Sequence, residues 1–102
     1  MLPQSEKAVR KIERTLSSLN GHVEDMTNGT INRTLDRLDK AGAMLTDVFI
    51  DEGRGYEKPS ETLRLSDPLA ILYRQLWEAR TLLHDEISRR YGPGAPSRLP
   101  RK

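Results

Sequence analysis

The chain has 102 residues, no cysteine and a formal net charge of +2, from 17 basic and 15 acidic residues. This length points to one domain, and the lack of cysteine excludes disulfides and thiolate metal sites. Charged residues make up 31% of the chain and aromatic residues 5%, which is typical of a small helical protein rather than a compact all-β fold. Because so short a chain has a limited core, we expect association with further copies to add stability.

The small net charge conceals an uneven distribution along the chain. Residues 1–14 carry +2 and residues 88–102 carry +5, whereas residues 15–53 carry −4 and residues 54–87 carry −1. A basic end can bind phosphate, because each Lys or Arg brought to a nucleic acid releases counterions. It can equally dock on an acidic protein surface or stay a solvated tail. The charge distribution alone leaves these alternatives open.

The sequence has no features of a membrane or secreted protein. No stretch approaches the roughly 18 consecutive apolar residues of a membrane span. The segment from Met1 to Glu6 lacks the basic and apolar regions of a secretory signal. We therefore expect a cytoplasmic protein with no membrane partner.

The first predicted element is a helix over residues 5–19, with Ser5 as its expected N-cap. Asn20-Gly21 is a stop signal inside the pattern, so the sequence leaves open whether the helix continues to residue 26. The apolar seam has the three- and four-residue spacing of a heptad pattern. It consists of Val9, Ile12, Leu16, Leu19, Val23 and Met26.

The second predicted element is a helix over residues 30–50, capped by Asn28 or Thr30. Because Gly42 in its seam has no side chain, we expect a neighbouring helix to approach closely there. A short turn joins the first two helices, so together they should form an αα-hairpin. The seam, again spaced by three and four, consists of Ile31, Leu35, Leu38, Gly42, Leu45 and Phe49.

A third helix is predicted over residues 67–91. Asp67 is a natural N-cap, Pro68 suits the first helical position, and Gly92 is a natural helix end. The apolar strip of this helix is broad, so we expect part of it to pack against another copy; the alternative is an intramolecular three-helix core. The residues predicted to mediate self-association are Leu69, Leu72, Tyr73, Leu76, Trp77, Leu83 and Ile87.

These elements predict an all-α fold with one helical domain over residues 1–92. Residues 51–66 form its long connection, in which residues 62–65 alternate like a short extended segment. Residues 93–102 form a basic, proline-rich tail that cannot continue the helix.

The sequence contains no motif for catalysis, and we predict neither an enzyme nor a cofactor. His22 and His84 are far apart and lie in no zinc-binding spacing, so no metal site is expected. No phosphate-cradling glycine loop and no serine nucleophile motif is present. Adjacent carboxylates such as Asp85-Glu86 are expected on the helix surface rather than in acid–base catalysis.

Residues 30–42, TINRTLDRLDKAG, resemble the recognition helix of bacterial winged-helix repressors. That resemblance implies strands at residues 45–50 and 62–65 on either side of a wing. Because the heptad pattern favours helix where this fold needs strand, a winged-helix transcriptional repressor is the alternative. The residues that it places on DNA are Asn32, Arg33, Arg37 and Arg54.

The segment from Asp67-Pro68-Leu69 to Ser97-Arg98-Leu99 is similar to the C-terminal part of some phage terminase small subunits. In that family a Pro-led helix is followed by a Gly/Pro turn and a Ser/Arg/Leu ending. The resemblance implies a ring-forming helical protein that engages viral DNA and hands it to a large, ATP-hydrolysing subunit. By position, the tail that contacts the large subunit or DNA includes Arg98, Arg101 and Lys102.

We therefore predict a non-enzymatic, oligomeric helical adaptor similar to a terminase small subunit in viral DNA packaging. Its candidate DNA-binding residues share one side of the first predicted helix, since they recur at spacings of three, one and three. They are Lys7, Arg10, Lys11 and Arg14.

Overall fold

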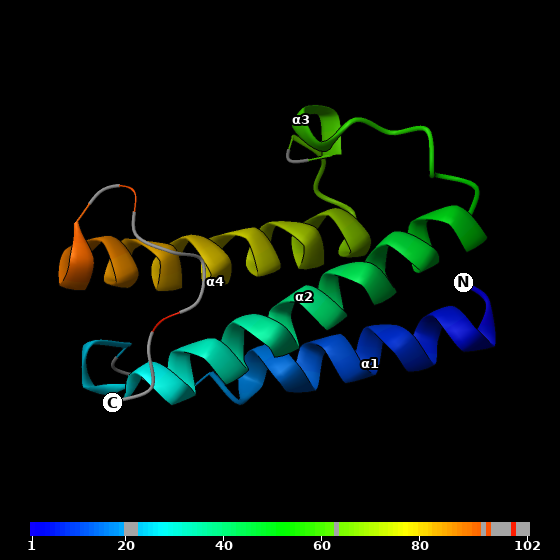
Figure 1. The fold of residues 1–102 in the computed structure, drawn as a ribbon. Helices are drawn as coiled ribbons and strands as arrows, with labels where there is room; N and C mark the ends of the chain where they lie inside the picture. Colours follow the sequence, from blue (N-terminus) through cyan, green and yellow to red (C-terminus); the bar gives the residue numbers. More distant parts are fainter. Residues whose placement is uncertain (20–22, 63, 93, 95–98, 100–102) are drawn as a thin grey trace.

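The computed structural model describes residues 1–19, 23–62, 64–92, 94 and 99, and its regular structure is helical (Figure 1). Successive long helices run in opposite directions: α1 (Pro3–Ser17), α2 (Asn28–Asp51) and α4 (Pro68–Tyr91). The 3₁₀ turn η1 (Val23–Asp25) lies between α1 and α2, and the single turn α3 (Pro59–Thr62) lies between α2 and α4. The predicted all-α class is confirmed.

The two ends of α4 follow directly from its sequence. The Asp67 carboxylate accepts a hydrogen bond from the Ala70 N–H at 3.2 Å, and Pro68 occupies the first turn. At the other end, Gly92 has a φ of 83°, a conformation that favours glycine, and its N–H donates to the Ser88 carbonyl at 2.7 Å. The predicted N-cap and helix end of α4 are therefore both confirmed.

The caps of the first two helices differ from those predicted. The N-cap of α2 is Thr27, whose hydroxyl accepts from the Thr30 N–H at 3.1 Å; Asn28 is inside the helix, where it has a different role. The N-cap of α1 is Leu2, without a side-chain hydrogen bond, because Pro3 starts the helix two residues early. Ser5 is therefore buried within α1.

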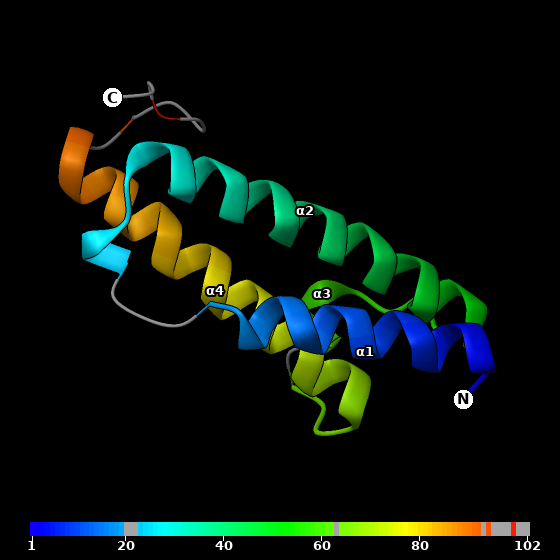
Figure 2. The same cartoon turned by 90° about the horizontal axis from the view of Figure 1, so that it is seen from below.

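The position where α1 ends shows that the first helix does not continue to residue 26. The helix ends at Ser17, before the Asn20-Gly21 stop signal, which lies outside the described residues. An extension of the helix to residue 26 is wrong, because Val23–Asp25 forms a separate 3₁₀ turn. Figure 2 shows that α2 and α4 both continue beyond the end of α1.

The structure contradicts the strands that a winged helix requires. Residues 45–50 belong to α2, which is helical without interruption from Asn28 to Asp51. Residues 59–62 form α3, so the predicted extended segment at residues 62–65 is also wrong at its start, and Leu63 lies outside the described residues. No strand occurs anywhere in the part of the chain that is described.

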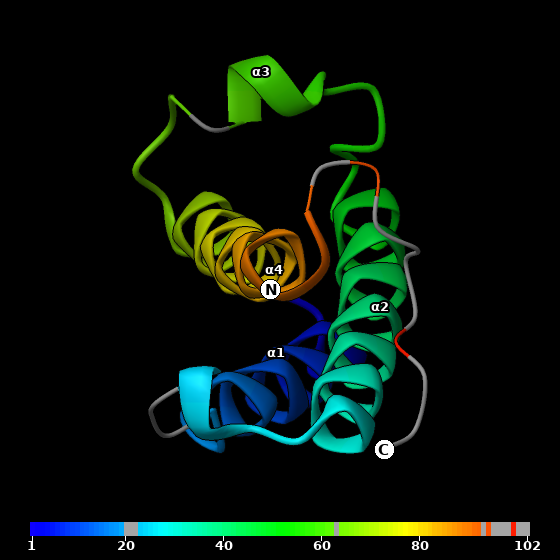
Figure 3. The ribbon, with the colours of Figure 1, turned by 60° about the vertical axis from the view of Figure 1, so that its left-hand side comes forward.

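The core lies where α2 packs along α1 on one side and α4 on the other, while α1 and α4 contact each other less (Figure 3). The predicted close approach at Gly42 is wrong, since nothing lies within 4 Å of the position its Cβ would take. Most buried side chains of α2 and α4 belong to the predicted seams, although Val48 does not, and within α1 only Ile12 of the predicted seam is buried. The buried side chains include Ile12, Ile31, Leu35, Leu38, Leu45, Val48, Leu69, Leu72, Leu76, Leu83 and Ile87.

Among the described residues, no helix combines the length and the apolar character needed to cross a lipid bilayer.

Candidate nucleic-acid interface

Four basic residues lie along one exposed side of α1: Lys7, Arg10, Lys11 and Arg14. Lys7 and Arg14 are seven positions apart, which corresponds to about 10 Å along the helix axis. All four side chains are exposed to solvent, as the sequence predicted. The row therefore presents cations over a length comparable to several phosphate spacings of a duplex.

The structure adds a second row of cations that the sequence did not connect with the first. Arg37 and Lys40 of α2 are exposed and lie beside Lys11 and Arg14 of α1 around a shallow depression of about 300 Å³. The antiparallel hairpin brings the two rows together. We call the six residues Lys7, Arg10, Lys11, Arg14, Arg37 and Lys40 the α1–α2 basic surface.

Little of this charge is neutralised within the chain. In the described residues, the single ion pair at the α1–α2 basic surface joins Arg10 to Glu6 at 4.0 Å, with both side chains largely exposed. No other acidic group of that part of the chain lies within 4.0 Å of the remaining five cations. Glu13 lines the opposite flank of α1. The counterions of this surface therefore come from solution and can be displaced by phosphate.

The winged-helix resemblance placed three residues of α2 on DNA, and of these Arg37 alone belongs to the α1–α2 basic surface. The Asn32 carboxamide instead holds the tail, donating to the Leu99 carbonyl and accepting from the Leu99 N–H, both at 2.8 Å. Arg33 is exposed and donates to the Thr30 hydroxyl at 3.3 Å. Asn32 therefore does not face a ligand.

One described residue of the tail is fixed to the helices. Leu99 is buried in the core, where the sequence left open whether the basic tail is solvated or bound to a partner. The three tail residues predicted to bind a partner lie outside the described residues: Arg98, Arg101 and Lys102.

Most residues predicted to mediate self-association belong to the core of the chain itself. Tyr73 is partly buried and Trp77 is exposed, so these two are accessible to another molecule. The other five are covered within the chain, as the alternative of a three-helix core requires. They are Leu69, Leu72, Leu76, Leu83 and Ile87.

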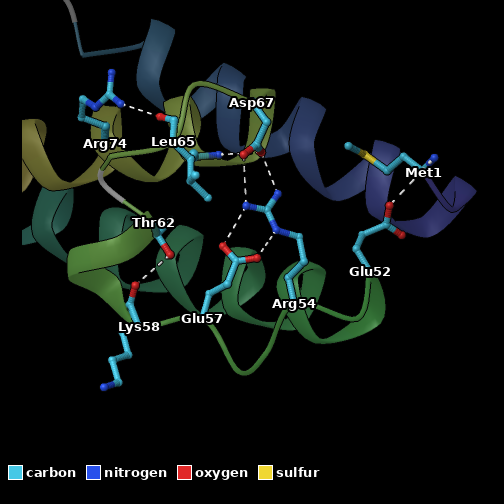
Figure 4. A network of polar contacts seen from close by, with 10 residues as sticks. Met1, Glu52, Arg54, Glu57, Lys58, Thr62, Leu65, Asp67 and Arg74 are labelled. Carbon is cyan, nitrogen blue, oxygen red and sulfur yellow. Dashed lines mark hydrogen bonds and ion pairs between the residues drawn. The ribbon is translucent and has the colours of Figure 1, made fainter.

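Arg54 has a structural role rather than the wing role that the resemblance implied (Figure 4). Its guanidinium donates to Asp67 at 2.6 and 3.1 Å and to Glu57 at 2.8 Å, and it lies 4.9 Å from the centre of the Phe49 ring. Hydrogen bonds from Arg54 lower the pKa of both carboxyls below their ordinary values. This cluster ties the connection to the N-cap of α4, and it leaves Arg54 unavailable for DNA.

A second cluster fastens the last turn of α4 to the start of α2. Arg90 donates to Glu86 at 2.5 Å, to the Asn28 carboxamide oxygen at 3.0 Å and to the Met26 carbonyl at 2.6 Å. The Asn28 amide donates in turn to the Tyr91 hydroxyl at 2.6 Å. Asn28 therefore joins two helices, which explains why a predicted capping residue is buried.

Glu86 is the acidic centre of this second cluster. Hydrogen bonds from Arg89 and then Arg90 lower its pKa from 4.5 to about 2. Both partners are cations within one turn of α4, so the carboxylate stays charged far into the acid range.

The described residues contain no cluster of side chains suited to holding a metal ion. No group of three His, Asp or Glu side chains in that part of the chain is placed to hold a metal ion. His84 is exposed, and His22 lies outside the described residues. An open groove of about 690 Å³ between α1 and α4 is lined mainly by apolar residues such as Leu16, Met26 and Leu82.

No protein-family model, curated protein or solved structure matches the chain. The functional argument therefore starts from the geometry of the α1–α2 basic surface.

Proposed function

We propose that this chain is a non-enzymatic helical adaptor that binds the phosphate backbone of DNA through the α1–α2 basic surface. The observation that supports this proposal is the joining of six exposed cations from two helices, five of them without an acidic partner among the described residues. A surface of this kind binds through the release of condensed counterions.

The composition of the surface favours contact with the backbone rather than with bases. Its side chains are Lys and Arg on an aliphatic floor that includes Ile12, Ala41 and Met44, and no aromatic residue lines the depression. Single-stranded bases bind by stacking on aromatic side chains, which this surface does not offer. Flexible cations on two parallel rows instead suit the regular phosphates of a duplex, whose contacts position a protein without reading sequence.

At the level of a family, we propose a terminase-small-subunit-like protein in viral DNA packaging. Three features agree with that role: the long Pro-led α4, the glycine turn that ends it and the basic tail. In this proposal several copies assemble in the host cytoplasm, and Arg98, Arg101 and Lys102 contact the large motor subunit or DNA.

The DNA proposal is tested by fluorescence anisotropy with a labelled duplex over a range of salt concentrations. If all six cations contact phosphate, the slope of log K against log salt is about −5. The double substitution Lys11→Glu/Arg14→Glu should lower affinity roughly 10- to 100-fold at low salt and reduce that slope by about 2.

The matched control is Lys58→Glu/Arg64→Glu, which changes net charge equally at two exposed residues of the connection. This control should retain most of the affinity. If both double variants lose affinity alike, binding depends on net charge alone and the proposed surface is wrong. If neither loses affinity, or the chain retains no duplex at low salt, the DNA proposal itself fails.

A further inference from the structure

Trp77 is exposed beside a hollow in the groove between α2 and α4. The indole side chain belongs to the largest apolar residue of the chain, yet the residue is 53% exposed. The hollow has a volume of about 280 Å³ and is bordered by Gly42, Thr46, Tyr73 and Trp77. Exposure of a tryptophan at the edge of a cavity is typical of a binding surface rather than of a solvated helix face.

Gly42 leaves its part of the hollow open because it has no side chain. A Cβ at this position would meet nothing within 4 Å, so neither α4 nor any other described residue fills the space above it. Glycine inside a helix is less stable than alanine by about 1 kcal/mol. No positive φ accounts for glycine here, since the residue lies in the middle of α2. The vacant space itself is the feature that glycine provides.

The size and charge of the patch point to one occupant. The hollow of about 280 Å³ has room for an aromatic side chain such as the indole that stands beside it. Asp39 and Arg80 form an ion pair at its edge, 3.6 Å apart and each about half exposed, which can exchange partners with the same pair of a second copy. A patch that contains a protruding ring, a vacant hollow, an acid and a base is complementary to itself, as a two-fold interface requires.

We propose that this patch is a two-fold self-association surface, in which the Trp77 indole of each copy enters the Gly42 hollow of the other. Across the two-fold axis, the Asp39 carboxylate of one copy also faces the Arg80 guanidinium of its partner. This inference builds on the self-association of the proposed adaptor but does not depend on its contact with DNA.

The proposed interface leaves the α1–α2 basic surface free. Gly42 and Lys40 are two residues apart on α2, which separates them by about 160° around the helix axis. A pair of copies joined at Gly42 therefore presents its two basic surfaces outward, so the pair can bind duplex at two places. Bivalent binding of this kind strengthens retention without new contacts.

The test uses the intrinsic fluorescence of Trp77, which is the single tryptophan of the chain. Emission and sedimentation equilibrium are measured on the full chain over a range of concentrations. We expect a blue shift of the emission maximum that follows the formation of a dimer, or of an even-numbered assembly of dimers. A chain that stays monomeric, an odd-numbered assembly, or association without a change in emission overturns the proposal.

Two variants separate the interface from the stability of the fold. Gly42→Leu fills the hollow and improves helix propensity, so it should raise the denaturation midpoint while weakening dimerisation at least tenfold. Trp77→Ser should abolish dimerisation. The control Leu82→Ser removes an equally exposed apolar residue from the opposite flank of α4 and should leave dimerisation unchanged.

If Gly42→Leu dimerises like the unaltered chain, or Leu82→Ser is impaired as much, the patch is not the interface. Duplex affinity at concentrations where the chain is monomeric distinguishes the two proposals. Gly42→Leu should bind duplex there as the unaltered chain does, whereas Lys11→Glu/Arg14→Glu should not.

Discussion

Removal of Arg90 should destabilise the fold far more than removal of its neighbour Arg89. The Arg90 side chain is 17% exposed, and its guanidinium donates hydrogen bonds to Glu86, the Asn28 side chain and the Met26 carbonyl. Hydrogen bonds that involve a charged group contribute about 1.5–3 kcal/mol each, and acceptors left without a donor add a desolvation cost. Arg90→Met should therefore lower the free energy of unfolding by about 3 kcal/mol, against a typical total of about 5–15 kcal/mol.

The matched control is Arg89→Met. Arg89 donates to the same Glu86 carboxylate at 2.7 and 2.5 Å, but its side chain is 62% exposed, and among the described residues its hydrogen bonds stay within α4. Solvent screening makes such a pair weak, so this variant should unfold close to the unaltered chain. Urea denaturation followed by circular dichroism measures both. Equal losses of stability for the two variants, or a loss below about 1 kcal/mol for Arg90→Met, would refute the proposed role of Arg90 in joining α4 to α2.

Two further predictions concern acid and the core. Because the folded pKa of Glu86 is about 2, below its ordinary 4.5, its stabilising effect is complete above pH 4.5 and is lost as pH falls toward 2. Glu86→Gln should therefore flatten the fall in stability over that window, as measured by urea midpoints at several pH values. Leu38→Ala, at a side chain that is 0% exposed, should cost about 3–5 kcal/mol, whereas Leu82→Ala, at 55% exposure, should cost much less in the same denaturation assay.

The helices were predictable because their determinants are local. A three- and four-residue apolar spacing depends only on the 3.6-residue period, so the seams of α2 and α4 predict their buried faces. Asp67, Pro68 and Gly92 act on backbone groups within one helical turn, and their roles are confirmed. The predicted N-cap Ser5 was wrong, because Pro3, which suits the first helical position, starts α1 two residues earlier.

The contacts that fix the polar residues were not predictable, because they join residues far apart in sequence. Asn32 meets the Leu99 backbone across 67 positions, and Arg90 meets Asn28 across 62. Nothing in the residues around Asn28 distinguishes a cap from a buried bridge until α4 is placed beside α2. The same holds for the second cation row, since Arg37 joins Lys11 only through the geometry of the hairpin.

The uneven charge of the sequence acquires a physical meaning in this arrangement. In the last part of the chain, the Arg90 guanidinium is hydrogen-bonded to Asn28 and Met26. The +5 of residues 88–102 therefore overstates the positive charge that a partner would meet. The +2 of residues 1–14 understates it, because Arg37 and Lys40 from the acidic middle segment join the same surface. Among the described residues, the cations without an acidic partner therefore gather on the α1–α2 hairpin, and phosphate binding should follow the hairpin.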